Sequence, residues 1–243
     1  MSVYDKIRNN KQQKVFAVLI DPDQYTDLQI DEVTRNVHES GVDLILVGGS
    51  LLIRDRLDQA IVRIRKASDK PVVLFPGSAM QVTAEADAIL LLSLISGRNP
   101  EMLIGQHVIA APYIKAAGLE VISTGYMLID GGRPTTASYM SNASPIPNDK
   151  NDIAVCTAMA GEMLGMQAVY LDGGSGARHP VPTGMVRDVC NNIKIPVIAG
   201  GGIKDPETAS KLCQAGADMI VVGNAIEKDH HMIREVSAAI RSF

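Results

Sequence analysis

The chain lacks the features that would place it outside the cell or in a membrane. Among its 243 residues there are only three cysteines, Cys156, Cys190 and Cys213. Their odd number and unpaired spacing argue against a disulfide framework or a cysteine metal site and indicate buried free thiols. The polar start, MSVYDKIRNNKQQK, lacks the apolar core of a signal peptide, and the longest apolar run, residues 88–95, is far too short to span a bilayer. We therefore expect a cytoplasmic protein without a transmembrane segment.

The sequence also lacks any concentration of positive charge. Its formal net charge is -4, and its 23 basic residues are scattered among 27 acidic ones. Binding to nucleic acid needs a positive face that displaces counterions, so we expect no nucleic-acid partner. A chain of this length can bury a large core, either as one barrel-sized domain or as two small domains.

Short apolar runs rich in β-branched residues alternate with helical patterns. The runs are residues 15–20, 43–47, 71–75, 87–93, 119–123, 168–172, 196–200 and 218–222. Helical periodicity covers residues 28–41, 54–68, 151–165, 182–193, 205–216 and 225–240. Continuous apolar runs indicate strands buried on both faces. Eight strands that alternate with helices predict an α/β fold, a single (β/α)8 TIM barrel over residues 1–243, and the alternative is a doubly wound open sheet.

One connection is too short for a regular helix. Only about 11 residues, PGSAMQVTAEA, separate the third and fourth strands, whereas a crossover with its helix needs at least ~10 to 12 and usually more. We therefore predict a modified barrel that lacks a regular third helix. The gap in the wall would expose an apolar groove beside the catalytic face, suited to an elongated apolar ligand. The alternative is a short loop over which the neighbouring elements close.

The segment after the fifth strand is unusually long. Residues 124–147, TGYMLIDGGRPTTASYMSNASPIP, are mostly small and polar. Long loops that follow barrel strands lie on the catalytic face and often act as lids. We predict a mobile loop there, and the alternative is a decoration without a chemical role.

Glycine-bearing turns follow the last strands. Gly201 and Gly202 follow the seventh strand, and Gly223 and Asn224 follow the eighth. In barrels these two loops commonly bind phosphate. Glycine permits positive φ and close approach of backbone N–H groups, and each following helix would direct its positive end at the anion. A third turn, residues 173–176, follows the sixth strand, so the three turns predict one phosphate cup.

Charged residues at the strand ends are the candidates for chemistry. Asp21 closes the first strand and is a candidate Mg2+ ligand, with Ser50 at the end of the second strand as a weaker one. Capping of the next turn is the alternative for Asp21. Asp172 ends the sixth strand, where it would act as a general base or as a structural carboxylate bonded to loop amides. Lys204 and Arg178 are candidate sources of positive charge, or solvated surface residues.

Five motifs resemble those of one known family. In chain order they are LIDPDQ, ILVGGS, YLDGGSGA, IAGGGIKDPETA and IVVGNAI. Together they resemble the geranylgeranylglyceryl phosphate synthases and the heptaprenylglyceryl phosphate synthases, from about residue 15 to the C-terminus. The resemblance implies a barrel without its third helix and a prenyltransferase that uses Mg2+. Such an enzyme joins a polyprenyl diphosphate, here expected to be geranylgeranyl diphosphate, to the 3-hydroxyl of sn-glycerol 1-phosphate through an ether bond and releases diphosphate.

The resemblance also implies roles for individual residues. Asp21 and Ser50 would bind Mg2+, and Asp172 would remove the proton from the attacking hydroxyl. Glycerol phosphate would be bound by Tyr170, Leu171, Asp172, Gly173, Gly174, Ser175, Gly176, Gly201, Gly202, Gly223 and Asn224. Family members are dimers or hexamers, so we expect a homo-oligomer, and we expect a transient membrane contact for the lipid product.

Two positions depart from the pattern of the family. Many relatives have glutamate where this chain has Asp172, so the carboxylate is one methylene shorter. One branch has a lysine two residues before the first aspartate of the DP motif, whereas this chain has Leu19. The chain therefore fits the other branch, and another cation must meet the phosphates. Two alternative functions stay open at this point: a phosphosugar isomerase or lyase of the same barrel class, and a non-catalytic barrel that binds phosphate or lipid.

Overall fold

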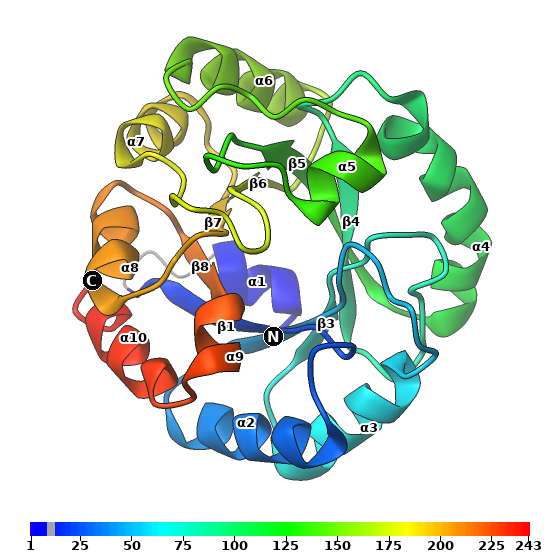
Figure 1. The fold of residues 1–243 in the computed structure, drawn as a ribbon. Helices are drawn as coiled ribbons and strands as arrows, with labels where there is room; N and C mark the ends of the chain where they lie inside the picture. Colours follow the sequence, from blue (N-terminus) through cyan, green and yellow to red (C-terminus); the bar gives the residue numbers. More distant parts are fainter. Residues whose placement is uncertain (9–12) are drawn as a thin grey trace.

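The computed structural model describes residues 1–8 and 13–243 of the chain. In this part, eight parallel strands pair in sequence order and close into a barrel, with helices around the outside (Figure 1). The strands are β1 (Val15–Ile20), β2 (Leu44–Val47), β3 (Val72–Leu74), β4 (Ala88–Leu94), β5 (Glu120–Leu128), β6 (Ala168–Asp172), β7 (Val197–Gly200) and β8 (Met219–Val222). The predicted (β/α)8 barrel is confirmed, and an open doubly wound sheet is excluded because β8 pairs with β1.

The helices follow the strands around the ring. They are α1 (Val3–Arg8), α2 (Asp27–Glu39), α3 (Leu57–Ala67), the π-helical turn η1 (Glu101–Gly105), α4 (Gln106–Ala117), α5 (Thr136–Ser141), α6 (Asn151–Met163), α7 (Thr183–Asn192), α8 (Pro206–Gln214), α9 (Asn224–Lys228) and α10 (Met232–Ile240). None of the helices within the described ranges is both long and apolar enough to cross a lipid bilayer. The helical pattern at residues 225–240 is interrupted, because α9 ends at Lys228 and α10 starts at Met232.

The helix that would follow the third strand, β3, is missing, as the sequence predicts. Residues 75–87 link β3 to β4 through turns and contain no helix. The wall of the barrel is therefore open between α3 and α4, and this gap creates the apolar groove described below.

Alternation along the strands separates two apolar layers. In β6 the side chain of Tyr170 points into the barrel, whereas Val169 and Leu171 pack between the sheet and the helices. In β1, Ala17 faces the interior and Val18 faces the helices. Residues two apart in a strand share a face, so the last inward position of β6 is Asp172.

The N-terminal helix α1 covers the lower end of the barrel. Its first backbone N–H groups, from Val3 and Tyr4, donate hydrogen bonds to the carboxylate of Glu120 at 2.7 and 2.8 Å. Val3 and Ile7 pack into the inner apolar layer together with Val15 at the start of β1. A small ligand therefore has to enter from the opposite end, where the strands finish.

The fifth strand is longer than the sequence indicates. Residues 124–128, predicted as the start of a loop, continue β5 and pair with β6 from Thr124 opposite Ala168 to Leu128 opposite Asp172. The connection that remains contains the short helix α5, which begins with a capping box between Thr135 and Ser138. The prediction of an irregular loop was therefore wrong over these two stretches, because strand pairing and a helix cap order them.

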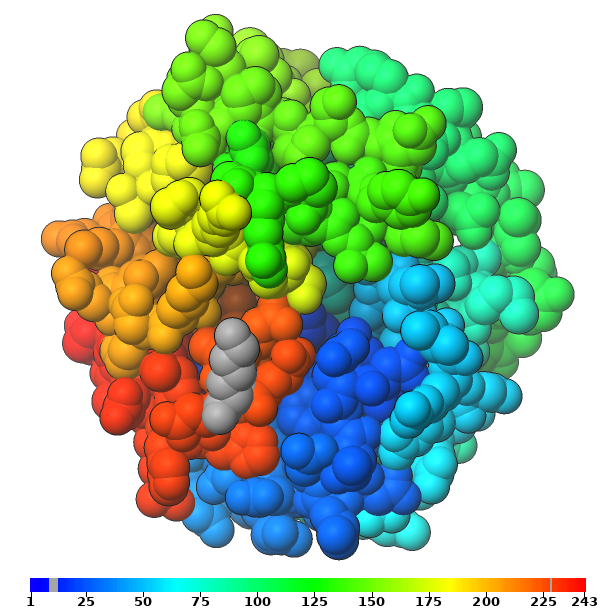
Figure 2. All heavy atoms as spheres, in the orientation of Figure 1, coloured from blue at the N-terminus to red at the C-terminus, as the bar shows by residue number. Residues whose placement is uncertain are grey.

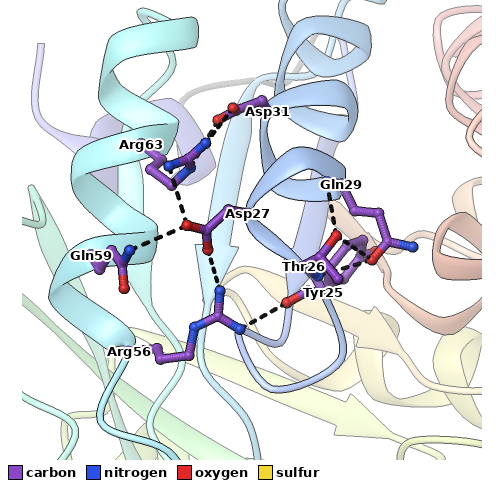
Figure 3. A network of polar contacts seen from close by, with 8 residues as sticks. All are labelled: Tyr25, Thr26, Asp27, Gln29, Asp31, Arg56, Gln59 and Arg63. Carbon is purple, nitrogen blue, oxygen red and sulfur yellow. Dashed lines mark hydrogen bonds and ion pairs between the residues drawn. The ribbon is translucent and has the colours of Figure 1, made fainter.

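A polar network joins α2 to α3 (Figure 3). The carboxylate of Asp27 pairs with both Arg56 and Arg63, and Arg63 also pairs with Asp31 at 2.5 Å. Arg56 donates a second hydrogen bond to the backbone oxygen of Tyr25 at 3.0 Å. Each partly exposed pair contributes little by itself. The network nevertheless links the loop after β1 to the start of α3, and so orders the catalytic face beside Asp21.

Candidate active site

Three turns meet where β6, β7 and β8 end. A Cβ atom at Gly201 would lie 2.7 Å from the backbone nitrogen of Gly173 and 2.5 Å from that of Gly174, so the β6 and β7 turns are in contact. The side-chain oxygen of Asn224 accepts hydrogen bonds from the Ser175 hydroxyl at 3.0 Å and from the Gly176 N–H at 2.8 Å. The structure therefore brings the three predicted turns together into one concave surface, which we call the phosphate cup (residues 173–176, 201–202 and 223–224).

The glycine at position 201 is required by its surroundings. Its φ angle is +77°, which side-chain-bearing residues rarely adopt, and a Cβ there would also collide with Oδ1 of Asp172. Gly223 differs from this expectation, because its φ of -123° needs no glycine. A Cβ at Gly223 would meet only ordinary contacts, with Leu19 at 3.5 Å, so neither its φ angle nor its neighbours require glycine.

The two helices that follow these turns differ at their N-termini. Helix α9 begins at Asn224, directly after Gly223. Helix α8 begins only at Pro206, and the carboxylate of Asp205 already accepts the N–H of Thr208 at 2.7 Å. The Asp205 cap adds a negative charge at the start of α8, which weakens the positive end that this helix was predicted to direct at the anion.

Asp172 is buried beneath the cup with one specific partner. Its Oδ2 accepts a hydrogen bond from the Tyr126 hydroxyl at 2.5 Å, and its Oδ1 accepts the N–H of Gly174 at 2.7 Å. Burial raises the pKa of Asp172 above its usual range, while the hydrogen bonds from Tyr126 and Gly174 oppose the rise. A raised pKa makes this carboxylate a better proton acceptor. The hydrogen bond from the Gly174 N–H also matches the alternative, a structural carboxylate bonded to loop amides. Asp172 can hold the loop through Oδ1 and act as a base in the same site.

The other two residues of the strand 6 motif occupy different environments. Tyr170 is buried inside the barrel, and its ring centroid lies 5.2 Å from that of Phe75 and 5.6 Å from that of Tyr126. The side chain of Leu171 points the other way, into the layer between sheet and helices. Its side chain is therefore not part of the site, because alternate residues of a strand face opposite sides. Only the backbone of Leu171 is left to take part in the predicted binding of glycerol phosphate.

Asp21 and Ser50 lie at the ends of neighbouring strands. A Cβ at Gly49, next to Ser50, would lie 2.7 Å from Oδ2 of Asp21. The N–H of Asp23 donates to Oδ1 of Asp21 at 3.0 Å, so the turn-capping role is present as well. Burial, followed by the charges of Asp23 and Glu227, raises the pKa of Asp21 from 3.8 to about 6.

This corner of the site suits a divalent cation. Oδ1 of Asp23 is buried and has no hydrogen-bond partner in the described chain. The pKa of Asp21 is raised first by burial and then by the negative charges of Asp23 and Glu227. The described residues include no cluster of three or more histidine, cysteine or acidic ligands that would hold a metal unaided. Mg2+ is commonly held by one or two carboxylates, waters and substrate phosphates, and Asp21 and Ser50 fit that kind of site.

An apolar groove opens beside the cup, where the third helix is missing. It encloses about 880 Å3, its open mouth included, and extends from Ser50 and Tyr126 down to His107 on α4. Its walls are mainly apolar and include Val82, Leu91, Leu94, Met102, Ala110 and Ile114. Figure 2 looks onto the face of the molecule where the loops surround the mouth. The predicted groove is therefore present, and neighbouring elements do not close over it.

Tyr126 is the residue that the sequence reasoning missed. It lines the groove and also donates to Asp172, so it connects the groove with the cup. The sequence analysis assigned it to a loop. The available signal was the β propensity of Ile122, Thr124 and Tyr126, which share one face of an extended strand.

Comparison with known proteins gives one consistent result. Residues 6–240 match the model of the PcrB family. The chain is 56% identical to the geranylgeranylglyceryl phosphate synthase of Chitinophaga pinensis over 97% of this chain and 93% of the relative, and 50% identical to that of Spirosoma linguale over 95% and 93%. Its fold is similar to the crystal structure of (S)-3-O-geranylgeranylglyceryl phosphate synthase from Thermoplasma acidophilum in complex with its substrate sn-glycerol 1-phosphate. That similarity has a TM-score of 0.95 and 35% identity over 100% of both chains.

Proposed function

The chain belongs to the PcrB family, and from this premise we propose that it is a prenyltransferase that attaches a prenyl group to sn-glycerol 1-phosphate. The observation that carries the proposal is the junction at Asp172 and Tyr126. A glycine-lined cup suited to phosphate lies on one side of it, and an apolar groove suited to a prenyl chain lies on the other. The two reacting groups would meet at the one buried carboxylate between them.

The reaction forms one carbon–oxygen bond and breaks another. The 3-hydroxyl oxygen of glycerol phosphate attacks the first carbon of the prenyl diphosphate, whose bond to the diphosphate oxygen breaks. Asp172 takes the hydroxyl proton on a carboxylate oxygen, and the bond from Tyr126 holds that carboxylate in place. When bound, Mg2+ would neutralise charge on the departing diphosphate, with Asp21 and Ser50 as its protein ligands.

The surroundings of the site explain how side reactions are limited. As the prenyl carbon loses diphosphate it gains positive charge, and water would convert it to a free alcohol. The walls of the groove are mainly apolar. Their polar side chains are Ser50, Ser78, Gln106, His107, Ser141 and Tyr126, and the Tyr126 hydroxyl donates to Asp172. Exclusion of water also strengthens each electrostatic contact within the site.

The test is synthesis by the purified protein. It is incubated with sn-glycerol 1-phosphate and labelled prenyl diphosphates of increasing length, with Mg2+ or with chelator, and the product is extracted into butanol. We expect a chelator-sensitive prenylglyceryl phosphate, with geranylgeranyl diphosphate as a good donor. Binding of glycerol phosphate by calorimetry without product from any donor would reject the enzyme in favour of a binding protein. Isomerisation of a small phosphosugar without metal would favour the isomerase.

We also propose that the protein is a homo-oligomer that uses the outer face of α4. This helix exposes apolar side chains to solvent, with Val108 69% and Tyr113 63% exposed beside Ile109. Exposed apolar surface of this kind commonly marks an interface. Replacement of Val108 and Tyr113 by glutamate should lower the mass measured by sedimentation. A matched pair of substitutions, Ile153→Glu and Met163→Glu on α6, should leave the mass unchanged if α4 forms the contact.

The transient membrane contact is proposed at the mouth of the groove. Around it, two loops expose Ile53 and Met80 by 84% and 88%, and helix α5 exposes Tyr139 by 83%. Neighbours of these residues in sequence line the groove itself, so a prenyl chain would reach it from a bilayer over apolar surface. Flotation with phosphatidylglycerol vesicles should fall when all three are changed to serine. Ile153→Ser and Met163→Ser on α6 serve as the control.

A further inference from the structure

The phosphate cup needs a cation that strand β1 does not supply. Leu19 holds the inward position at the end of β1, against Gly223 of the cup. Lys204, which follows the β7 turn, donates from Nζ to the backbone oxygen of Arg178 at 2.8 Å. The ammonium group of Lys204 is thus engaged with a carbonyl group in the adjoining loop. One carbonyl oxygen leaves the charge of Lys204 and two of its N–H donors unused, so Lys204 is a second candidate beside any other cation near the cup.

The guanidinium group of Arg133 lies against the cup. Its Nη2 occupies the space that a Cβ of Gly176 would fill. Gly176 is the residue whose N–H donates to Asn224, where the β6 and β8 turns join. Arg133 therefore reaches from the connection after β5 across to the wall of the cup, and it is exposed to solvent on its other side.

The backbone that carries Arg133 is fixed on both sides. The carbonyl oxygen of Gly131 accepts the N–H groups of Arg178 at 2.8 Å and His179 at 3.1 Å. Thr135 packs with its side chain against Gly174 and caps helix α5 through the N–H of Ser138 at 3.3 Å. The segment is thus attached to the β6 turn before Arg133 and again after it. This attachment limits the positions that the guanidinium can reach.

Arg133 has no carboxylate partner of its own. Within the described ranges its side chain makes no ion pair or hydrogen bond. The acidic residue nearest to it in sequence, Asp130, accepts the N–H of Gly132 at 2.8 Å. An arginine held beside backbone turns without an anion is ready to bind one, because its planar fork matches the oxygens of a phosphate.

We propose that Arg133 binds the phosphate group of glycerol phosphate, in place of the cation that β1 lacks. This inference rests on the proposed function for the identity of the ligand, and on the position of the guanidinium for its place in the site. Arg133 is a binding residue in this proposal. It neutralises the phosphate and fixes the glycerol, so that the 3-hydroxyl faces Asp172.

The first test is affinity, measured without turnover. Titration calorimetry with sn-glycerol 1-phosphate compares the unaltered protein with Arg133→Gln and Arg133→Lys. Hydrogen bonds to charged groups are strong enough that the glutamine variant should bind roughly ten- to a hundredfold more weakly. The lysine variant keeps the charge but loses the fork, so its affinity should lie between the two and should depend more steeply on salt.

The second test separates the two substrates. In the prenyl transfer assay, Arg133→Gln should raise KM for glycerol phosphate about as much as it weakens binding. KM for the prenyl diphosphate should stay within about twofold, because the variant loses a contact with glycerol phosphate alone. A rise confined to KM for the prenyl diphosphate would overturn the assignment to glycerol phosphate. A purely structural role for Arg133 would affect both KM values and would not be rescued by lysine.

Two other arginines serve as controls. Arg187 is exposed on α7, away from the cup, so Arg187→Gln should match the unaltered protein. Arg178→Gln tests the neighbouring candidate, and a larger effect there than at Arg133 would overturn the proposal. If the unaltered protein makes product and Arg133→Gln has unchanged affinity, the inference falls while the function stands. If no product forms but binding depends on Arg133, the function falls while the inference stands.

Discussion

The two halves of the catalytic face differ in the groups that line them. On the side of β6, β7 and β8, the cup consists of backbone turns with glycine at nearly every contact. On the side of β3, β4 and β5, the groove consists of aliphatic and aromatic side chains from strands, turns and α4. One half presents mainly main-chain groups, joined by the side chains of Ser175 and Asn224, and the other presents apolar side-chain surface.

The difference explains how each half tolerates change. The β6 and β7 turns of the cup are lined mainly by glycine backbone, so an added methyl group at Gly201 collides with neighbouring atoms. A groove made of side chains changes its length and width whenever one wall residue changes. Recognition of the phosphate is therefore expected to be rigid, and recognition of the prenyl chain adjustable. Asp172 and Tyr126 join the two halves, and damage there should affect both substrates.

The largest effect is expected where the halves meet. Asp172→Asn keeps the shape but removes the proton acceptor, so kcat should fall by roughly 10^2- to 10^4-fold while KM for glycerol phosphate changes little. Because burial raises the pKa of Asp172 and catalysis needs the ionised form, kcat/KM should fall as pH drops through that raised pKa. Asp152→Asn on the exposed face of α6 is the control. If Asp172→Asn kept a kcat within about threefold of the unaltered enzyme, Asp172 would not be the base.

The next largest effect tests the rigidity of the cup. Gly201→Ala places a methyl group against Asp172 and the N–H of Gly174, so kcat/KM for glycerol phosphate should fall roughly a hundredfold. Gly118→Ala is a matched control. Its φ is +70°, close to that of Gly201, but no atom lies within 4 Å of the added Cβ. Backbone strain should cost both variants about 1 to 2 kcal/mol of stability. The collision at Gly201 should add to that loss, and only Gly201→Ala should lose activity.

A smaller and more selective effect is expected in the groove. Ala79 lines it, so Ala79→Phe should narrow it. KM for long prenyl diphosphates should rise about tenfold and KM for short ones less, since a pocket of this kind discriminates by volume. Glycerol phosphate should bind as before. Ala160→Phe, exposed on α6, is the control. An equal loss with donors of every length would show that the halves are not independent.

The smallest effect concerns stability at the metal corner. The pKa of Asp21 is about 6 in the folded protein against an ordinary value of 3.8. The folded protein therefore binds a proton at Asp21 more tightly than the unfolded chain does. The contribution of this proton binding to the stability of the folded protein is complete below about pH 4 and is lost as pH rises through about 6. Without Mg2+ at pH 7.5, Asp21→Asn should raise the Tm by a few degrees, and this gain should vanish near pH 4. Added Mg2+ should stabilise the unaltered protein but not the variant.

Much of the architecture could be predicted from local sequence. Continuous β-branched runs predicted the strands, and β1 and β6 match their predicted bounds. Spacing alone predicted the missing helix, because the chain between β3 and β4 is too short. The glycine turns could be located because backbone recognition needs glycine wherever a side chain would collide. By contrast, residues 124–128 were assigned to a loop, since their extension of β5 depends on pairing with β6.

The sequence by itself determined the barrel, the open wall beside β3 and the three turns of the cup. Each follows from the period, length or absence of side chains in a contiguous stretch, where the physical cause is local. Only the tertiary structure decided that Tyr126 donates to Asp172, that the side chain of Leu171 faces away from the site, and that Arg133 lies against Gly176. These contacts join residues tens of positions apart, and their geometry depends on how strands close into a ring and how loops pack on one another.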